Sequence, residues 1–571
     1  MTIDHTSDDI SDDISDDISD DHNSEDVAES TVDGTGALDT VGAVLADHAR
    51  RRGDHPFVVC DEERLTYADA ERASRELARG LVGAGIGRGA HVGLLFPTGV
   101  DFVVTWLAVV RVGAVAVPIS TFSTADELAG LVRGADVQLL VMVPEYRGND
   151  YLAAVVRAFP GADLRSDRAW SLPDAPHLRR LAVVGEPSGV GPFHSLDGLR
   201  DEGAAVDADL VTRIEADVGP DDRMVIVHTS GSTSAPKGVI HQHGPLLRHL
   251  AGLNGVRGMT ADTRLFSNSP LFWIGGLGYN VVGTLVAGAT LVCSRAEHPA
   301  ATLDLIERER PDMVNGFAQS VAALVSDPSF AARDFSFIRT GNLYPIMPPH
   351  LRPADPELRH NMLGMTETGS VALMSPDERD QPERHRGSFG RPVPGLEARV
   401  VDPESGRDCP PGDEGELWLR GPNLMEGYYG RERHEVFTPD GWFRTGDVFC
   451  TDEDGYFFFK GRRGDMIKTS GANVSPREVE PVVRDVTGAE LVIVLGVPDP
   501  RRDQVVAAVL VLPEDAAFDE ATVVAALRDR LSAYKVPRRY ARVTREALPV
   551  LSSGKPDMRA VLELFEAADE R

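Results

Sequence analysis

Apolar residues from about residue 37 onward follow two alternating patterns. Amphipathic spacing, typical of helices, covers residues 100–112 and 127–134 and begins again near Pro245. Short continuous apolar runs, typical of buried strands, lie at residues 91–96, 114–118, 137–143 and 223–228. Repeated strand–helix alternation predicts an α/β fold with parallel sheets covered on both sides.

The pattern changes after Pro392. Strands expected at Glu397–Val401 and Glu416–Arg420, joined by a segment rich in Pro, Gly and Asp, predict a small antiparallel β subdomain. A tight turn at Asp454-Gly455 then leads to FFFKGRRGD, which we interpret as a hinge. We therefore predict a large N-terminal domain over residues 37–460 and a mobile α+β lid over residues 461–571 that closes over a substrate.

The first 36 residues are strongly acidic. They contain thirteen Asp and Glu, no Lys or Arg, and three copies of SDDI. Repulsion between the paired Asp residues predicts a disordered head with no part in the chemistry; the alternative is an electrostatic interaction tail. The head accounts for 13 of the 31 net negative charges of the 571 residues and leaves −18 on the other 535. This charge argues against nucleic acid and anionic membranes as general partners.

Composition indicates a reduced cytoplasmic protein. The apolar fraction of 42% is enough for a large core. The most apolar stretch, residues 91–119, is interrupted by Pro97, Asp101 and Arg111 within the ~20 residues that a membrane span needs. The head lacks the basic start and apolar run of a signal peptide. No metal-binding spacing joins the cysteines, which we expect to be buried free thiols: Cys60, Cys293, Cys409 and Cys450.

The strongest chemical signal is VIVHTSGSTSAPKGVIHQHG at residues 225–244. A buried strand is followed there by hydroxyl side chains, glycine and one cation, which can bind a polyphosphate through N–H, O–H and ammonium groups. The Walker pattern would need Gly at position 236 and Ser or Thr at 238, where this chain has Pro236 and Gly238. The predicted phosphate-binding residues are Thr229, Ser230, Gly231, Ser232, Thr233 and Lys237.

This loop resembles the signature loop of the adenylate-forming (AMP-binding) superfamily of acyl- and aryl-CoA synthetases, luciferases and peptide-synthetase adenylation domains. The resemblance covers nearly everything after residue 37, because further family motifs follow in order: LTYADAERASRELARGL, GAVAVPIS, NMLGMTETG, GELWLRGPNLMEGYYG, GWFRTGDV, GRRGDMIKTSGANVSPREVE and LPVLSSGKPDMR. It implies a large N-terminal domain, a mobile C-terminal lid and a two-step reaction. A carboxylate and MgATP give an acyl-adenylate and pyrophosphate, and an acceptor then takes the acyl group.

The resemblance also implies roles for single residues. The catalytic residues would be Lys237, Glu367 and Lys555, and Glu367 and Thr229 would bind Mg²⁺. Lys468 and Gly471 would serve the second half-reaction. ATP binding would further involve Asn342, Asn361, Met362, Thr366, Asp447 as the ribose-binding carboxylate, and Arg462. The acid pocket would be lined by Trp273, Phe317, Gly341, Tyr344 and Gly364, whose rings favour an apolar or aromatic acid.

Some positions depart from the family pattern. Trp273 stands where many CoA ligases have His, and Leu363 replaces the Tyr that commonly stacks on adenine. Our first hypothesis is an ATP-dependent ligase of the acyl-CoA synthetase type that joins an apolar or aromatic acid to CoA. The alternatives are carrier-protein loading, nitrite activation that diazotises an aromatic amine, and, more remotely, an inactive nucleotide-binding paralogue. The sequence predicts no particular oligomeric state.

Overall fold

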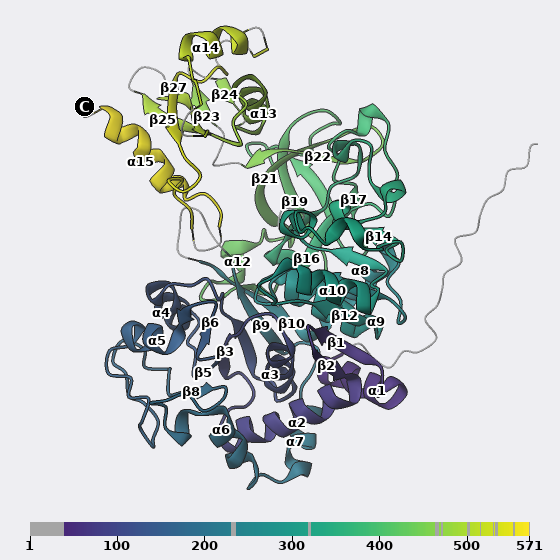
Figure 1. The fold of residues 1–571 in the computed structure, drawn as a ribbon, viewed down its shortest axis with the longest axis vertical. Coiled ribbons are helices and arrows are strands. Elements are labelled where there is room, and N and C mark those ends of the chain that lie inside the picture. The colour runs from purple at the N-terminus through teal and green to yellow at the C-terminus, as the bar shows by residue number, and fades with distance from the viewer. Residues whose placement is uncertain are drawn as a thin grey trace, which may run out of the picture. The chain divides into compact units, whose positions relative to one another are not determined.

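The computed structural model describes eleven segments of the chain: residues 39–229, 236–317, 321–462, 467–469, 472–474, 476–499, 503–513, 516–528, 530–531, 535–551 and 554–569. The acidic head predicted over residues 1–36 lies outside the described residues. Helices and strands are labelled in Figure 1.

A seven-stranded sheet carries the predicted phosphate loop. Its five strands from β9 to β8 are parallel, and β10 and β20 extend it in antiparallel fashion. Its order is β20 (Gly427–Tyr428), β10 (Gly238–Gln242), β9 (Arg223–His228), β4 (Val115–Pro118), β3 (His91–Leu95), β5 (Leu139–Met142) and β8 (Arg180–Val183).

Helices cover both faces of this sheet, as the continuous apolar runs predict. Successive residues of a strand point to opposite faces. Leu139 and Val141 on β5 therefore join the core shared with α2 and α3, whereas Leu140 and Met142 pack with α4 and α5. The helices of this region, which can be followed in Figure 1, are α1 (Val41–Arg52), α2 (Tyr67–Gly83), α3 (Val100–Arg111), α4 (Ala125–Gly134), α5 (Tyr151–Ala158), α6 (Leu196–Gly203) and α7 (Ala208–Ala216).

A second, six-stranded sheet is parallel except at β2. Its order is β14 (Thr340–Gly341), β13 (Met313–Asn315), β11 (Arg264–Ser267), β12 (Thr290–Cys293), β1 (Pro56–Cys60) and β2 (Glu63–Thr66). The helical segments of residues 243–325 are α8 (His243–Val256), the π-helix η2 (Gly275–Val282), α9 (Gly283–Ala287), α10 (Pro299–Glu309) and α11 (Ala322–Val325).

The antiparallel region predicted after Pro392 is confirmed as a four-stranded sheet. Its order is β18 (Glu397–Val401), β19 (Gly415–Arg420), β21 (Phe443–Thr451) and β22 (Phe457–Arg462). A three-stranded sheet precedes it, formed by β15 (Leu363–Met365), β16 (Ser370–Met374) and β17 (Arg391–Pro392), and the short helix α12 (Arg433–Val436) lies between β20 and β21. The predicted domain boundary at residue 461 falls near the end of β22, and the division into body and lid stays a prediction.

The C-terminal residues form a sheet of their own with helices on both faces. Its strands are β23 (Ile467–Thr469), β24 (Ala472–Val474), β25 (Leu491–Asp499), β26 (Asp503–Val511) and β27 (Arg539–Val543). Val492 and Val494 pack toward α13 (Pro476–Thr487) and α14 (Glu520–Arg528), whereas Ile493 and Leu495 pack toward α15 (Met558–Asp569). The α+β class predicted for this part is confirmed.

Two further predictions can be compared with the structure. All four cysteines are free thiols, and three are buried, but Cys409 is only partly buried, which corrects the expectation for that residue. Among the described residues, none of the helices combines the length and apolar character that a membrane crossing requires.

Candidate active site

Thr229 and Lys237 lie at the base of a β-hairpin loop. The pairing of β9 with β10 ends at His228 and Gly238, and the Thr229 N–H then donates to the Lys237 carbonyl oxygen at 3.0 Å. The buried strands thus hold both ends of the predicted phosphate loop. Of the other predicted residues of this loop, Ser230, Gly231, Ser232 and Thr233 lie outside the described residues.

Tyr428 connects Lys237 to Glu367. It lies on β20 directly opposite Val239 of β10, which places its ring beside the start of β10. The Lys237 Nζ lies 5.0 Å from the centre of this ring, within the range of a cation–π contact. The Tyr428 hydroxyl donates to Glu367 Oε1 at 2.8 Å. Two predicted catalytic residues, 130 positions apart, thus share one aromatic side chain.

Burial and charge keep Tyr428 protonated. Burial is the largest cause that raises the pKa of its hydroxyl, and the Glu367 carboxylate raises it further. The positive charges of Arg431 and Arg462 act in the opposite direction. The phenol therefore remains a hydrogen-bond donor to Glu367 throughout the physiological range of pH.

Glu367 is carried on a short 3₁₀ turn, Thr366–Thr368, that is fixed from two sides. His241 Nε2 on β10 lies 2.7 Å from the Thr366 carbonyl oxygen, and the Met425 N–H donates to the Glu367 carbonyl oxygen at 3.0 Å. Burial lowers the pKa of His241 to about 4, so the ring is neutral and Nε2 carries the proton that it donates. The turn ends at Gly369, whose positive φ of 71° favours glycine.

Asp447 in the middle of β21 and Arg462 at the end of β22 face each other where the pairing of these strands ends. They are register partners, and the Arg462 Nε lies 3.3 Å from Asp447 Oδ1. The structure therefore brings Lys237 and Glu367 together at Tyr428 and pairs Asp447 with Arg462. The charge of Arg462 also acts on the pKa of Tyr428.

Further predicted residues of the ATP site and of the acid pocket lie at the end of β14 and around the start of β15. Asn342 accepts from the Gly316 N–H and donates to the Gly316 carbonyl oxygen, both at 2.9 Å, so its amide fixes the neighbouring loop. Gly341 has a φ of 136°, and a Cβ there would lie 1.9 Å from the Val314 carbonyl oxygen, so only glycine fits. Asn361 and Gly364 are exposed, and Met362 receives a weak contact from the Tyr279 hydroxyl at 3.9 Å.

Trp273 and Phe317 meet within an aromatic cluster that we define as Phe122, Phe272, Trp273 and Phe317. The Trp273 and Phe317 rings lie edge to face with centroids 5.7 Å apart, and Phe122 contacts both Phe272 and Trp273. Phe122 and Phe317 are 46% and 49% exposed, so the cluster presents aromatic surface to a ligand. Tyr344 is partly buried and packs against the core of Val314, Leu343 and Ile346.

The predicted C-terminal residues lie on turns and strands of the last sheet region. Lys555 is exposed and lies in a tight turn, in which the Leu551 N–H donates to the Lys555 carbonyl oxygen at 2.8 Å. Lys468 lies on β23 opposite Asn473. Gly471 lies outside the described residues.

Sequence reasoning missed Tyr428, His241 and Phe122. Tyr428 stands in the quoted motif GELWLRGPNLMEGYYG and His241 in the phosphate-loop segment, so both lay within recognised motifs. Their role depends on the pairing of β20 with β10 and on the approach of the 366–368 turn to β10, which no local pattern encodes. Phe122 follows β4 and carries no signal beyond its apolar side chain.

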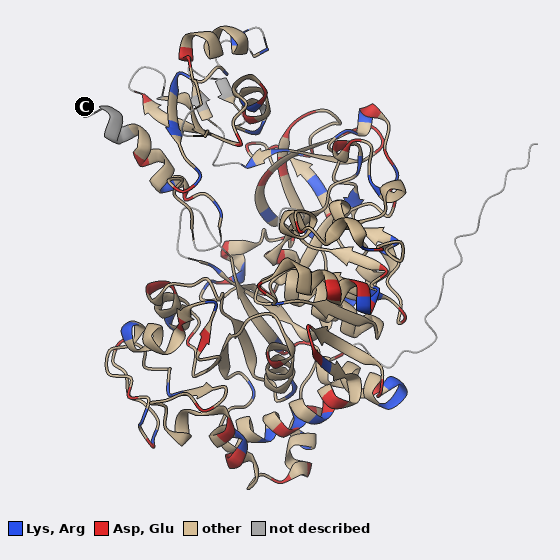
Figure 2. Cartoon of the chain, in the orientation of Figure 1, with Lys and Arg blue, Asp and Glu red and all other residues tan. Residues whose placement is uncertain are grey.

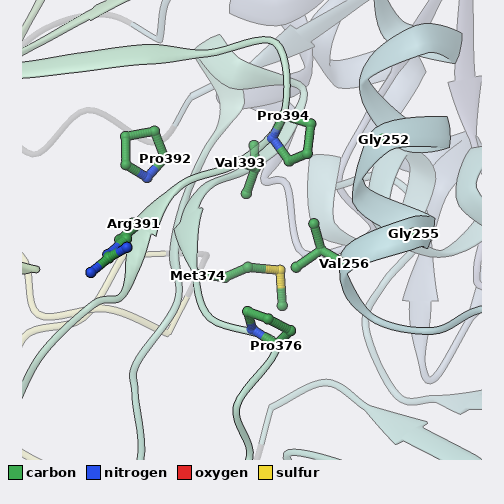
Figure 3. Close-up of a pocket in the computed structure, with 9 residues that line it drawn as sticks. All are labelled: Gly252, Gly255, Val256, Met374, Pro376, Arg391, Pro392, Val393 and Pro394. Atoms are coloured by element: carbon green, nitrogen blue, oxygen red, sulfur yellow. The ribbon is translucent and has the colours of Figure 1, made fainter. Parts of the chain in front are cut away.

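An apolar cavity of about 410 Å³ lies elsewhere, between the second half of α8 and the β16–β17 region. Figure 3 shows Met374 directed toward Val256 and Pro376, while Arg391 points away from them. None of the predicted site residues lines this cavity.

Comparisons with known proteins cover most of the chain. The AMP-binding enzyme model matches residues 45–429, and the AMP-binding enzyme C-terminal domain model matches residues 478–555. A feruloyl-CoA synthase of Amycolatopsis sp is 33% identical over 503 residues, which are 86% of this chain and 92% of that protein. An indoleacetate–CoA ligase of Aromatoleum aromaticum is 30% identical over 504 residues, again 86% and 92% of the two chains.

A solved structure is also similar over nearly its whole length. ATP-bound MatB from Rhodopseudomonas palustris superposes with a TM-score of 0.74 at 26% identity, over 92% of this chain and 99% of that one. With a family model that matches more than half of the chain, these likenesses show that the chain belongs to the AMP-binding enzyme family and is an AMP-forming ligase of the acyl-CoA synthetase type.

Proposed function

We propose that this enzyme activates an apolar or aromatic carboxylic acid with MgATP and then transfers the acyl group to CoA. The first step gives acyl-AMP and pyrophosphate, and the second gives the acyl-CoA thioester and AMP. The observation that carries the proposal is the convergence of Lys237 and Glu367 on Tyr428, and the Asp447–Arg462 pair adds a carboxylate and a cation. A cation, a carboxylate for a metal ion and a carboxylate for a ribose are the groups that ATP binding requires.

The oxygen donors around Glu367 fit Mg²⁺. Glu367 Oε1 accepts from Tyr428, and among the described residues nothing hydrogen-bonds Oε2, which leaves one carboxylate oxygen for a hard cation. Thr229 adds a hydroxyl at the base of the phosphate loop. Bound there with the phosphates of ATP, Mg²⁺ would supply charge neutralisation for the departing pyrophosphate.

The remaining polar groups suit the other parts of the nucleotide. Lys237, held over the Tyr428 ring, can bind the phosphate chain as a point charge. Asp447 can accept from two vicinal ribose hydroxyls, with Arg462 as its partner at 3.3 Å. Lys555, on its exposed turn, would be delivered by the lid to bridge the acid and the α-phosphate.

The aromatic cluster supports an apolar or aromatic acid. Phe122 and Phe317 present about half of their surface, and Trp273 lies between them. Such surfaces bind rings and hydrocarbon through burial of apolar area and edge-to-face contacts. CoA as the acceptor is supported by the CoA ligases among the relatives, and we place the reaction in the cytoplasm.

A panel of acids tests the proposal. Aromatic acids, medium-length fatty acids and nitrite are each assayed for acid-dependent ATP–pyrophosphate exchange, and for AMP release with and without CoA. Products are identified by mass spectrometry. We expect exchange with an aromatic or apolar acid and a thioester product that requires CoA.

Each other outcome points to a different activity. Exchange without any CoA thioester would indicate a different acceptor such as a carrier protein. Turnover of nitrite with an aromatic amine would replace the thioester proposal by diazotisation. Absence of exchange with every acid would favour a nucleotide-binding protein without this activity.

A further inference from the structure

We propose that Tyr428 is a positioning residue that assembles the ATP site, because its hydroxyl orients Glu367 and its ring holds Lys237. This inference rests on the proposed function, since it concerns the same nucleotide site. It adds a residue that touches neither the reacting acid nor the α-phosphate and acts through two others.

The hydroxyl of Tyr428 fixes one of the two carboxylate oxygens of Glu367. The 2.8 Å contact is a hydrogen bond to a charged acceptor, and such bonds are about twice as strong as neutral ones. Tyr428 itself is 8% exposed and is held in β20 by its pairing with β10. A rigid donor therefore defines which oxygen of Glu367 is engaged and which faces a cation.

The ring of Tyr428 restrains Lys237 at the same time. A lysine side chain has four rotatable carbon bonds, and its ammonium would otherwise occupy many positions. The ring centre, 5.0 Å from Nζ, attracts the ammonium through its negative face. Both charges that handle the phosphates are thus placed before ATP arrives, which lowers the reorganisation needed when it binds.

The adjacent tyrosine provides a matched control. Tyr429 points to the opposite side of the strand, where its hydroxyl donates to Asp136 Oδ2 at 2.7 Å. Tyr429→Phe removes the same atom one residue away from the proposed positioning contact. Tyr428→Phe and Tyr429→Phe each remove one hydroxyl group, but the first affects Glu367 and the second affects Asp136.

The experiment measures ATP binding by calorimetry, once in EDTA and once with saturating Mg²⁺. We expect Tyr428→Phe to bind metal-free ATP like the wild type, because the ring remains. The increase in ATP affinity on adding Mg²⁺ should be about tenfold smaller in this variant than in the wild type. Tyr428→Leu should lose that gain and also bind metal-free ATP about fivefold more weakly, because Lys237 loses its aromatic contact. Tyr429→Phe should match the wild type in both conditions.

A double-mutant cycle with Glu367→Gln separates positioning from a general structural role. In the Glu367→Gln background, adding Tyr428→Phe should cost no further Mg²⁺-dependent affinity, because the carboxylate that Tyr428 orients toward the cation is already gone. An unchanged Mg²⁺ gain in Tyr428→Phe would overturn the proposal, and so would an equal loss in Tyr429→Phe. If the wild type binds no ATP, the proposed function itself fails together with this inference.

Discussion

At the scale of single residues, Lys555 has the most specific predicted role. Its ammonium would stabilise charge that develops between the acid and the α-phosphate, and such groups contribute strongly because the charge exists only in the transition state. We expect Lys555→Ala to lower acid-dependent ATP–pyrophosphate exchange by about 10²–10³. Lys468→Ala is the matched control, since it should spare adenylate formation and slow thioester formation. Adenylate formation at the wild-type rate in Lys555→Ala would refute the assignment.

Trp273 is the residue that should control which acid binds. It contacts Phe122 and Phe317, so its removal opens the aromatic cluster from the middle. We expect Trp273→Ala to raise the KM for an aromatic acid about tenfold, since an aromatic pair contributes about 0.5–1.5 kcal/mol beyond the burial of its area. The KM for ATP should not change. Steady-state kinetics with both substrates varied provide the test, and parallel increases in both KM values would argue against a role in the acid pocket.

The sequence could predict site residues that stand in recognisable motifs, but not roles that depend on contacts between distant strands. Lys237 and Glu367 stand in motifs with a recognisable order, and the structure brings both to one place. Tyr428 stands in such a motif too, but its proposed role requires that β20 pair with β10 across 187 or more positions. Tyr344 packs against the core around Leu343 and Ile346, and its place in the acid pocket stays a prediction.

At the scale of elements, continuous apolar runs predicted four of the parallel strands, β3, β4, β5 and β9. The runs at residues 91–96 and 223–228 correspond to β3 and β9 almost residue for residue, because these strands are covered on both faces. The π-helix η2 could not be predicted in this way. It depends on contacts such as the Asn280 Nδ2 donation to the Gly275 carbonyl oxygen at 2.9 Å, and on the Asn280 bond to Ser267 Oγ at 2.8 Å.

His249 on helix α8 should make the stability of the fold depend on pH in the acid range. This side chain is fully buried, and burial lowers its pKa to about 4, from 6.5 in an unfolded chain. Between pH 6.5 and pH 4 the unfolded chain binds a proton that the folded chain does not, so stability falls as the pH falls through this window. In the described part of the chain its Nδ1 has no hydrogen-bond partner, and its Nε2 lies 3.4 Å from the Ser370 hydroxyl.

Replacing His249 by an apolar residue should therefore flatten the pH dependence of stability. We expect His249→Leu to gain roughly 1–2 kcal/mol over the wild type on going from pH 6.5 to pH 5, because leucine takes up no proton. Denaturant unfolding at pH 7, 6 and 5 measures the difference. Stability curves that stay parallel over this range would show that His249 does not contribute to the acid sensitivity.

At the scale of the whole molecule, the charge distribution separates the head from the enzyme. In the view of Figure 2, acidic and basic residues are interspersed along α1 and α2, and many of them pair, as Arg75 does with Glu71 at 2.7 Å. The thirteen Asp and Glu of residues 1–36 have no Lys or Arg among them. The family matches begin at residue 45, so the similarity to adenylate-forming enzymes does not extend into this segment.

Deletion of residues 1–36 tests whether the head takes part in the reaction. The truncated protein loses thirteen negative charges and keeps a net charge of −18, so it should elute earlier from an anion-exchange column. We expect its acid-dependent exchange rate and its KM for ATP to stay within about twofold of the full chain, because charges more than about 10 Å away are screened at 0.1 M salt. Measuring both proteins at 20 mM and 200 mM salt provides the control. A large loss of activity on deletion would instead establish the head as a functional electrostatic tail, and a loss confined to low salt would identify long-range attraction as its cause.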